Sequence, residues 1–284
     1  MSEELREQLG ELLGAAVEGP MVTVGRGYTP ALRRLVRLAD GRRVFVKAAT
    51  NNSTAQWLRD EQRIYTRLEA TFLAKHIAFA DGERPVMVLE DLSQAHWPPP
   101  WRRDDVAAVR AAMSAVAACQ PAHLPPLDPE IIQTGWQTVA TDPEPFLSLG
   151  FVPAAWLSRA LPRLTAAALT VDLSGASLLH GDLRSDNLCL RGDQVVLVDW
   201  NYACLGNPEV DLAFWLPSLA MEGGGQPESI LPAAPGLAAM VSGFFAARAG
   251  LPLISHAPRV RQIQQVQLSA ALPWAIRALG LPTP

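Results

Sequence analysis

Four polar side chains that suit phosphate and metal chemistry fall in two short segments of the chain. Residues 180–187 read HGDLRSDN, and Asp199 follows the apolar run VVLV a few residues later. Phosphoryl transfer from a nucleotide requires a carboxylate to orient or deprotonate the attacking hydroxyl, oxygen ligands for magnesium, and a cation near the phosphates. The segments offer Asp182 as the base and Arg184 as the cation. Asn187 and Asp199 offer the hard oxygen ligands that Mg²⁺ prefers.

The first third of the chain predicts a small antiparallel sheet and one helix. Short runs with β-branched and aromatic residues are separated by turn signals such as Asp-Gly, which is typical of hairpins. We expect strands at 21–25, 31–38, 42–48, 76–80 and 85–92, and a helix at 54–69. This part of the chain must position whatever binds the phosphates.

The rest of the chain predicts mainly helices. The segment HWPPPW cannot lie inside a helix or a central strand, so we place a lobe boundary just before it. Asp104 or Asp105 can cap a long helix to about Cys119, and further helices extend to the C-terminus. The expected architecture is α+β and bilobal, with a first lobe at 1–92 and a second at 93–284.

The two polar motifs, HGDLRSDN and VLVDWN, resemble those of the aminoglycoside phosphotransferase and choline kinase family, relatives of the protein kinases. The resemblance implies a protein-kinase-like fold and transfer of phosphate from ATP or GTP, with Mg²⁺, to a small-molecule hydroxyl. It also implies that Asp182 orients the acceptor and that Asn187 and Asp199 hold the metal. By the same resemblance, His180 braces the catalytic loop, and Asp211 in NPEVDLAFW anchors it.

A kinase also needs a strand lysine on the phosphates, held by a helical glutamate. The chain has only two lysines, and Lys47 ends the strand-like run VFVK. Glu61 falls on the apolar face of the following predicted helix, near Trp57 and Ile64. Because an unpaired buried carboxylate is strongly unfavourable, Lys47 is the expected partner of Glu61.

Two further segments are expected to contact the nucleotide. Gly25 and Gly27 in VGRGYTP fit a turn that covers the phosphates. VLEDL resembles the segment that hydrogen-bonds the base through its backbone, which assigns that role to Glu90 and Leu92. Bulky Phe45 stands where protein kinases usually have a small residue under adenine, so ATP and GTP both remain candidates.

Composition limits the possible partners. A net charge of −4 without a basic stripe argues against nucleic acid as a partner. Three cysteines without zinc or disulfide spacing, and an acidic N-terminal segment unlike a signal peptide, favour a cytoplasmic protein. No segment predicts a membrane span, and the sequence carries no signal of oligomeric state.

The acceptor is the most open part of the prediction. The excess of acidic over basic residues lies in the part of the chain after residue 92. It favours an amine-bearing, aminoglycoside-like antibiotic as the acceptor, with choline or homoserine as alternatives. A nucleotide-binding pseudokinase with a regulatory role is a second hypothesis. A third is a metal-dependent phosphoesterase with His180, Asp182 and Asp199 as ligands, although such sites generally need several histidines.

Overall fold

The computed structural model describes residues 2–25, 27, 30–121, 124–255 and 257–284. The chain divides into two compact units, each with its own contacts. Unit 1 is the chain up to Pro98 together with Asp186–Ala203, and unit 2 is Pro99–Ser185 together with Cys204–Pro284. The division thus comes after residue 98 rather than 92, and it groups a short later segment with the first unit. The expected α+β class is confirmed, with the sheet in unit 1 and most helices in unit 2.

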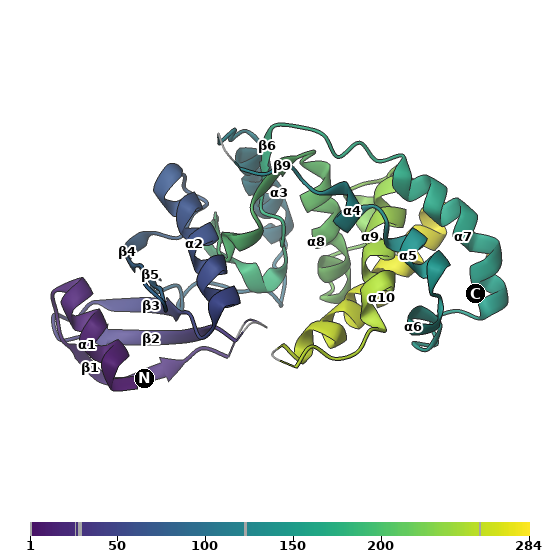
Figure 1. Ribbon diagram of the computed structural model, residues 1–284. Helices are drawn as coiled ribbons and strands as arrows, with labels where there is room; N and C mark the ends of the chain where they lie inside the picture. The colour runs from purple at the N-terminus through teal and green to yellow at the C-terminus, as the bar shows by residue number, and fades with distance from the viewer. Residues whose placement is uncertain (1, 26, 28–29, 122–123, 256) are drawn as a thin grey trace. The chain divides into compact units, whose positions relative to one another are not determined.

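Unit 1 contains a five-stranded antiparallel sheet in the order β1-β2-β3-β5-β4 (Figure 1). Its elements are α1 (Ser2–Leu13), β1 (Val17–Thr23), β2 (Leu32–Leu38), β3 (Arg43–Ala48), α2 (Asn52–Arg67), β4 (His76–Ala80) and β5 (Val86–Glu90). All five expected strands are present. The first begins four residues earlier than expected, because the edge strand continues through a register irregularity between Glu18 and Val22.

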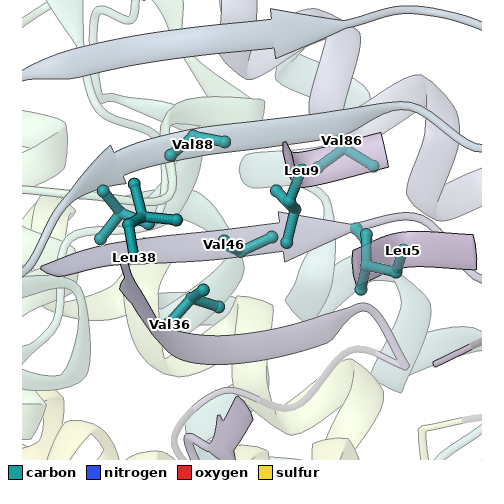
Figure 2. Close-up of a cluster of buried hydrophobic side chains, with 9 residues drawn as sticks. Leu5, Leu9, Val36, Leu38, Val46, Val86 and Val88 are labelled. Atoms are coloured by element: carbon teal, nitrogen blue, oxygen red, sulfur yellow. The ribbon is translucent and has the colours of Figure 1, made fainter. Parts of the chain in front are cut away.

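One face of this sheet is covered by α1. Figure 2 shows Leu5 and Leu9 of this helix against Val36, Val46 and Val88 from three neighbouring strands. Side chains alternate between the two faces of a strand, so the residues between these valines point to the opposite face. The sheet therefore has one face in the hydrophobic core under α1, and its opposite face does not contribute to that core.

Helix α2 begins with a capping box. The Asn51 side chain accepts a hydrogen bond from the Thr54 N–H, and the Thr54 hydroxyl oxygen accepts one from the Asn51 N–H. Such a cap satisfies backbone donors that have no partner within the helix. The buried side of the helix carries Leu58 and Ile64, and Glu61 lies among them at 1% exposure.

The segment 186–203 belongs to unit 1 because its hairpin bonds to that unit. The hairpin consists of β7 (Leu188–Arg191) and β8 (Gln194–Leu197). The Leu197 N–H donates to the carbonyl of Phe72, and His96 and Leu190 exchange backbone hydrogen bonds. Two short 3-10 helices flank it, η1 (Ser185–Asn187) and η2 (Trp200–Tyr202), so Asn187 and Asp199 are both held in unit 1.

Unit 2 is mainly helical. Its elements are α3 (Asp105–Ala117), α4 (Pro129–Ile132), α5 (Gly135–Thr141), α6 (Glu144–Leu147), α7 (Ala154–Leu169), β6 (Ser177–Leu179), β9 (Cys204–Gly206), α8 (Glu209–Met221), η3 (Pro227–Ser229), α9 (Pro235–Ala249) and α10 (Arg259–Ala278). Helix α9 packs against α5, α7 and α10 (Figure 1). A Cβ atom at Gly135 would lie 2.1 Å from the carbonyl oxygen of Gly243, so the approach of α5 to α9 requires glycine.

The expected cap of α3 is different in detail. The Asp104 side chain makes no capping hydrogen bond, whereas Asp105 accepts one from the Arg102 N–H at 2.7 Å. Across the ranges that the structure covers, no helix combines the length and the apolar character needed to cross a bilayer.

Candidate active site

A buried ion-pair network joins three elements of unit 1. The Lys47 Nζ of β3 donates to the Glu61 Oε2 of α2 at 2.6 Å and to the Asp199 Oδ1 that follows β8. The Lys47 and Glu61 side chains are 7% and 1% exposed, and that of Asp199 is 24% exposed. Residues far apart in the sequence thus place one ammonium between two carboxylates.

The network fixes the charge of the lysine. Burial alone would lower the pKa of Lys47, but the attraction of Asp199 and Glu61 outweighs it and holds that pKa above its ordinary value. Burial raises the pKa of Glu61, against the opposing effect of Lys47. The ammonium therefore stays charged at neutral pH.

Asp199 has an unusual backbone. Its φ of 70° makes it the one non-glycine residue with positive φ in the described part of the chain. Its N–H donates to the Glu61 Oε1 at 3.1 Å, so Glu61 contacts both the backbone of Asp199 and the ammonium of Lys47. Such backbone conformations cost energy and tend to occur at functional sites.

These side chains border a cavity of unit 1. Its charged and amide-bearing wall contains Arg33, Lys47, Glu61, Asp186, Asn187 and Asp199, with Glu90 and Ser93 also on its border. Its apolar wall contains Val24, Leu35, Phe45, Leu89, Leu92, Trp97 and Val198. A mostly apolar cavity with a few charged groups suits a ligand with a flat ring and an anionic end.

The segment after β5 borders the same cavity, and one backbone group of Glu90 is already hydrogen-bonded. Its backbone N–H donates to the Lys75 carbonyl at 3.0 Å, so its backbone can reach a base only through the carbonyl oxygen. Its carboxylate accepts from the Lys75 N–H and pairs with Arg191 at 2.7 Å. The carbonyl of Leu92 accepts from the Trp97 indole at 3.0 Å, which leaves the Leu92 N–H for the expected role.

The glycine turn is described only in part. Gly27 borders the cavity and has φ of 92°, which favours glycine, whereas Gly25 is exposed and contacts nothing at the position of a Cβ. Arg26, Tyr28 and Thr29 of the same turn lie outside the described residues.

In unit 2, Asp211 of α8 holds the start of the HGDLRSDN loop. Its carboxylate accepts from the His180 N–H and from the Gly181 N–H, the latter at 2.9 Å. His180 is fully buried, and its Nδ1 accepts from the Asp182 N–H at 3.3 Å. Burial raises the pKa of Asp211, while His180 and the two backbone donors oppose that shift.

Arg184 pairs with the expected base. Its guanidinium lies 3.2 Å from the Asp182 Oδ2, and the two side chains are 18% and 32% exposed. Both residues belong to unit 2, and they precede the unit 1 segment, which starts at Asp186, by four and two residues. The expected base therefore has a cation beside it within its own loop.

A second carboxylate of α8 holds the end of this loop, which the sequence did not reveal. Glu222, the C-cap of α8, accepts from the Ser185 hydroxyl and from the Trp101 indole, the latter at 2.9 Å. The Ser218 hydroxyl lies 3.4 Å from it. A carboxylate at a helix C-terminus is disfavoured by the helix dipole, so these donors offset an unfavourable position. Only the presence of Ser185 within the motif could have hinted at this contact.

The expected magnesium ligands fit the ion chemically. Asn187 is 3% exposed, and its amide oxygen and the Asp199 carboxylate belong to residues that border one cavity. Magnesium is usually held by one or two carboxylates together with phosphate oxygens, so two protein ligands suffice. Among the described residues, no group of three or more His, Cys, Asp or Glu side chains could hold a metal ion, which gives the phosphoesterase hypothesis no support.

Comparison with known proteins gives a family and several similar structures. The profile of the phosphotransferase enzyme family (APH) matches residues 23–249. A choline/ethanolamine kinase family protein from Mesorhizobium loti is 15% identical, covers 99% of both chains and has a TM-score of 0.66. A thermostable mutant of aminoglycoside phosphotransferase APH(4)-Ia, in ternary complex with AMP-PNP and hygromycin B, is 17% identical over 95% of this chain and 98% of its own, with a TM-score of 0.64. Macrolide 2'-phosphotransferase type I is 16% identical, covering 100% of this chain and 97% of its own, with a TM-score of 0.55. No curated protein matches the sequence.

Proposed function

Because the chain belongs to the phosphotransferase enzyme family, we propose that it transfers the γ-phosphate of ATP or GTP to a hydroxyl group of a small molecule. The observation that carries this proposal is the network of Lys47, Glu61 and Asp199 on the wall of one cavity. A buried ammonium that is charged at neutral pH and held by two carboxylates suits a nucleotide phosphate. Solved structures of similar fold supply further support, since two mutants of aminoglycoside phosphotransferase APH(4)-Ia hold AMP-PNP and ADP.

In this proposal the residues of unit 1 bind the donor. The apolar wall with Phe45 packs against the base, and the Leu92 N–H and Glu90 carbonyl face its edge. Lys47 binds the phosphates, and Glu61 keeps the ammonium in position. Asn187 and Asp199 would hold Mg²⁺, which when bound supplies positive charge that neutralises the transferring phosphate.

Unit 2 supplies the proposed base. The Asp182 carboxylate accepts the proton of the acceptor hydroxyl while the oxygen of that hydroxyl forms its bond to the γ-phosphorus and the bond to the β-phosphate oxygen breaks. Arg184 stands beside Asp182 and is the proposed cation near the transferred group. Asp211, His180 and the loop backbone keep the base in position.

We propose an aminoglycoside-like antibiotic or a related small metabolite as the acceptor. The acidic excess beyond residue 92 suits an amine-bearing molecule. The hygromycin B complex of one relative and the choline/ethanolamine kinase name of another are consistent with amine-bearing acceptors. A choline-like or homoserine-like metabolite remains the alternative acceptor, and a cytoplasmic location remains a prediction.

The test is a transfer assay with ATP and GTP over a panel of aminoglycosides, macrolides, choline and homoserine, read by mass spectrometry of the phosphorylated product. Asp182→Ala should lower turnover by about 10² to 10⁴, the range for a general base, with nucleotide affinity unchanged. Asp193→Asn, in the exposed turn of the β7–β8 hairpin, is the matched control and should have wild-type turnover.

Two results would contradict the proposal. If Asp182→Ala retains wild-type turnover, the base is assigned wrongly. If nucleotide stabilises the protein but no panel member is phosphorylated, the pseudokinase hypothesis gains support over the kinase.

A further inference from the structure

Arg33 is a buried cation that the mechanism above does not use. It lies on β2, is 8% exposed, and borders the same cavity as Lys47 and Asp199. Arginine is rarely buried to this extent without an anionic or hydrogen-bonding role. Its charge and its place on the cavity wall make it a candidate ligand-binding residue.

The strand register places Arg33 directly opposite Lys47. In the antiparallel pairing of β2 with β3, Arg33 pairs with Lys47 and Leu35 pairs with Phe45. All four residues border the cavity. The alternate residues of these strands, such as Val36 and Val46, belong to the core on the opposite face, so Arg33 and Lys47 share the cavity face of the sheet.

Arg33 and Lys47 thus bring two cationic side chains to the wall of one cavity, and Glu61 and Asp199 pair with the lysine. Two cationic residues on one cavity wall suit a multiply charged anion.

Gly27 lies close to this arginine. A Cβ atom at residue 27 would lie 2.6 Å from the Arg33 Cζ, which is the far end of a flexible side chain. Gly27 also has φ of 92°, which favours glycine independently. The Arg33 Nη1 donates to the Ala31 carbonyl at 3.2 Å, which fixes the plane of the group next to the glycine turn.

We infer that Arg33 is a second phosphate-binding residue of the nucleotide site, acting from β2 beside Lys47. Its planar guanidinium can bind two phosphate oxygens at once, whereas Lys47 provides a single point charge. This inference rests on the proposed function, because it assigns the residue to a nucleotide di- or triphosphate.

The experiment compares ligands that differ only in phosphates. Binding of AMP-PNP, ADP and adenosine is measured by calorimetry with Mg²⁺ for the full-length wild type, Arg33→Met, Arg33→Lys and Arg37→Met. Arg37 is the matched control because it lies on the same face of β2, is 67% exposed, pairs with Glu18, and does not border the cavity. Circular dichroism checks that every variant is folded.

Arg33→Met should weaken ADP and AMP-PNP about 10-fold to 100-fold, the range for a hydrogen bond to a charged group, and leave adenosine within about 2-fold. Arg33→Lys should recover part of the loss, and Arg37→Met should match the wild type. Equal weakening of adenosine and ADP would assign Arg33 a structural role and overturn the inference, as would wild-type ADP affinity in Arg33→Met. If the wild type binds none of the three ligands, the proposed function fails and the inference fails with it, which is a distinct result.

Discussion

Replacing Lys47 by methionine removes the charge at the centre of the buried network. The Lys47 ammonium lies 2.6 Å from Glu61, which at an effective dielectric constant of about 20 corresponds to roughly 6 kcal/mol of gross attraction. Desolvation cancels much of this attraction, but removing one partner leaves the other buried and unpaired. The net loss in the free energy of unfolding is then about 3–5 kcal/mol for a buried pair.

The loss of stability in Lys47→Met should depend on pH, because Glu61 can become neutral by taking up a proton. Burial already raises the pKa of Glu61 despite the opposing charge of Lys47, so removing that charge raises it further. A carboxyl whose folded pKa exceeds its unfolded pKa binds protons more tightly in the folded protein. Stability is therefore greatest at low pH and falls as pH rises from the unfolded pKa to the folded one, by about 1.4 kcal/mol per unit.

The assay is urea unfolding followed by circular dichroism from pH 5 to pH 8. Lys47→Met should be closest to the wild type at pH 5 and furthest from it at pH 8. Lys75→Met replaces the other lysine of the chain, which is exposed, and should change stability by less than about 0.5 kcal/mol. Lys47→Met combined with Glu61→Leu should be more stable than Lys47→Met alone at pH 8, since the unpaired buried carboxylate is gone.

If the loss of stability in Lys47→Met is the same at every pH, this reasoning is refuted, because no buried carboxylate would then take up a proton. A double variant less stable than the single one would refute it as well, because Glu61 would then stabilise the fold without its partner.

Three further predictions concern unit 2 and the sheet. Asp211→Asn replaces one of two acceptor oxygens with a donor facing a backbone N–H, so it should cost about 1–3 kcal/mol of stability and lower kcat without changing ADP affinity, measured by urea unfolding, kinetics and calorimetry. Glu222→Leu leaves the Ser185 hydroxyl and the Trp101 indole without their acceptor and should lower both stability and kcat, whereas Glu222→Gln should retain most of the stability. Burial lowers the pKa of His76, so the unfolded chain takes up the proton first as pH falls below about 6.5; wild-type stability should drop in that range more than that of His76→Phe, measured by unfolding midpoints against pH.

Most of the sheet could be predicted because its strands are bounded by strong turn signals. The strand at 76–80 is predicted to the residue, and the Asp-Gly turn before β3 fixes that hairpin. The start of β1 could not be predicted, because Gly19 and Pro20 suggest a break. On an edge strand, however, proline and an irregularity in register are tolerated.

The grouping of 186–203 with the first unit could not be predicted from local pattern. It depends on backbone hydrogen bonds from this segment to Phe72 and His96, about a hundred residues away in the chain. No periodicity of side chains records such contacts. The proline-rich segment does mark the first division, since contacts divide between Pro98 and Pro99 within HWPPPW, but composition gives no sign of the second crossing at 186–203.

The candidate site could be predicted where a buried charge requires a partner of opposite charge. Glu61 lies on an apolar helix face, so its charge required a cation, and only two lysines were available. The sequence does not indicate that Arg33 is buried. In the run LRRL two arginines lie between two leucines, and either arginine could face solvent. Only the register with β3 decides that Arg33 faces the cavity.

The alternation of β2 and β3 thus explains why one short stretch of sheet can serve both stability and binding. Val36 and Val46 are confined to the core under α1, so a change of strand register by one residue would exchange the core and cavity faces. The hydrophobic core therefore fixes which side chains face the cavity, and Lys47 faces it because its neighbours Val46 and Ala48 are buried in the core. A substitution that loosens the packing of Leu5 or Leu9 should weaken nucleotide binding even though neither residue borders the cavity.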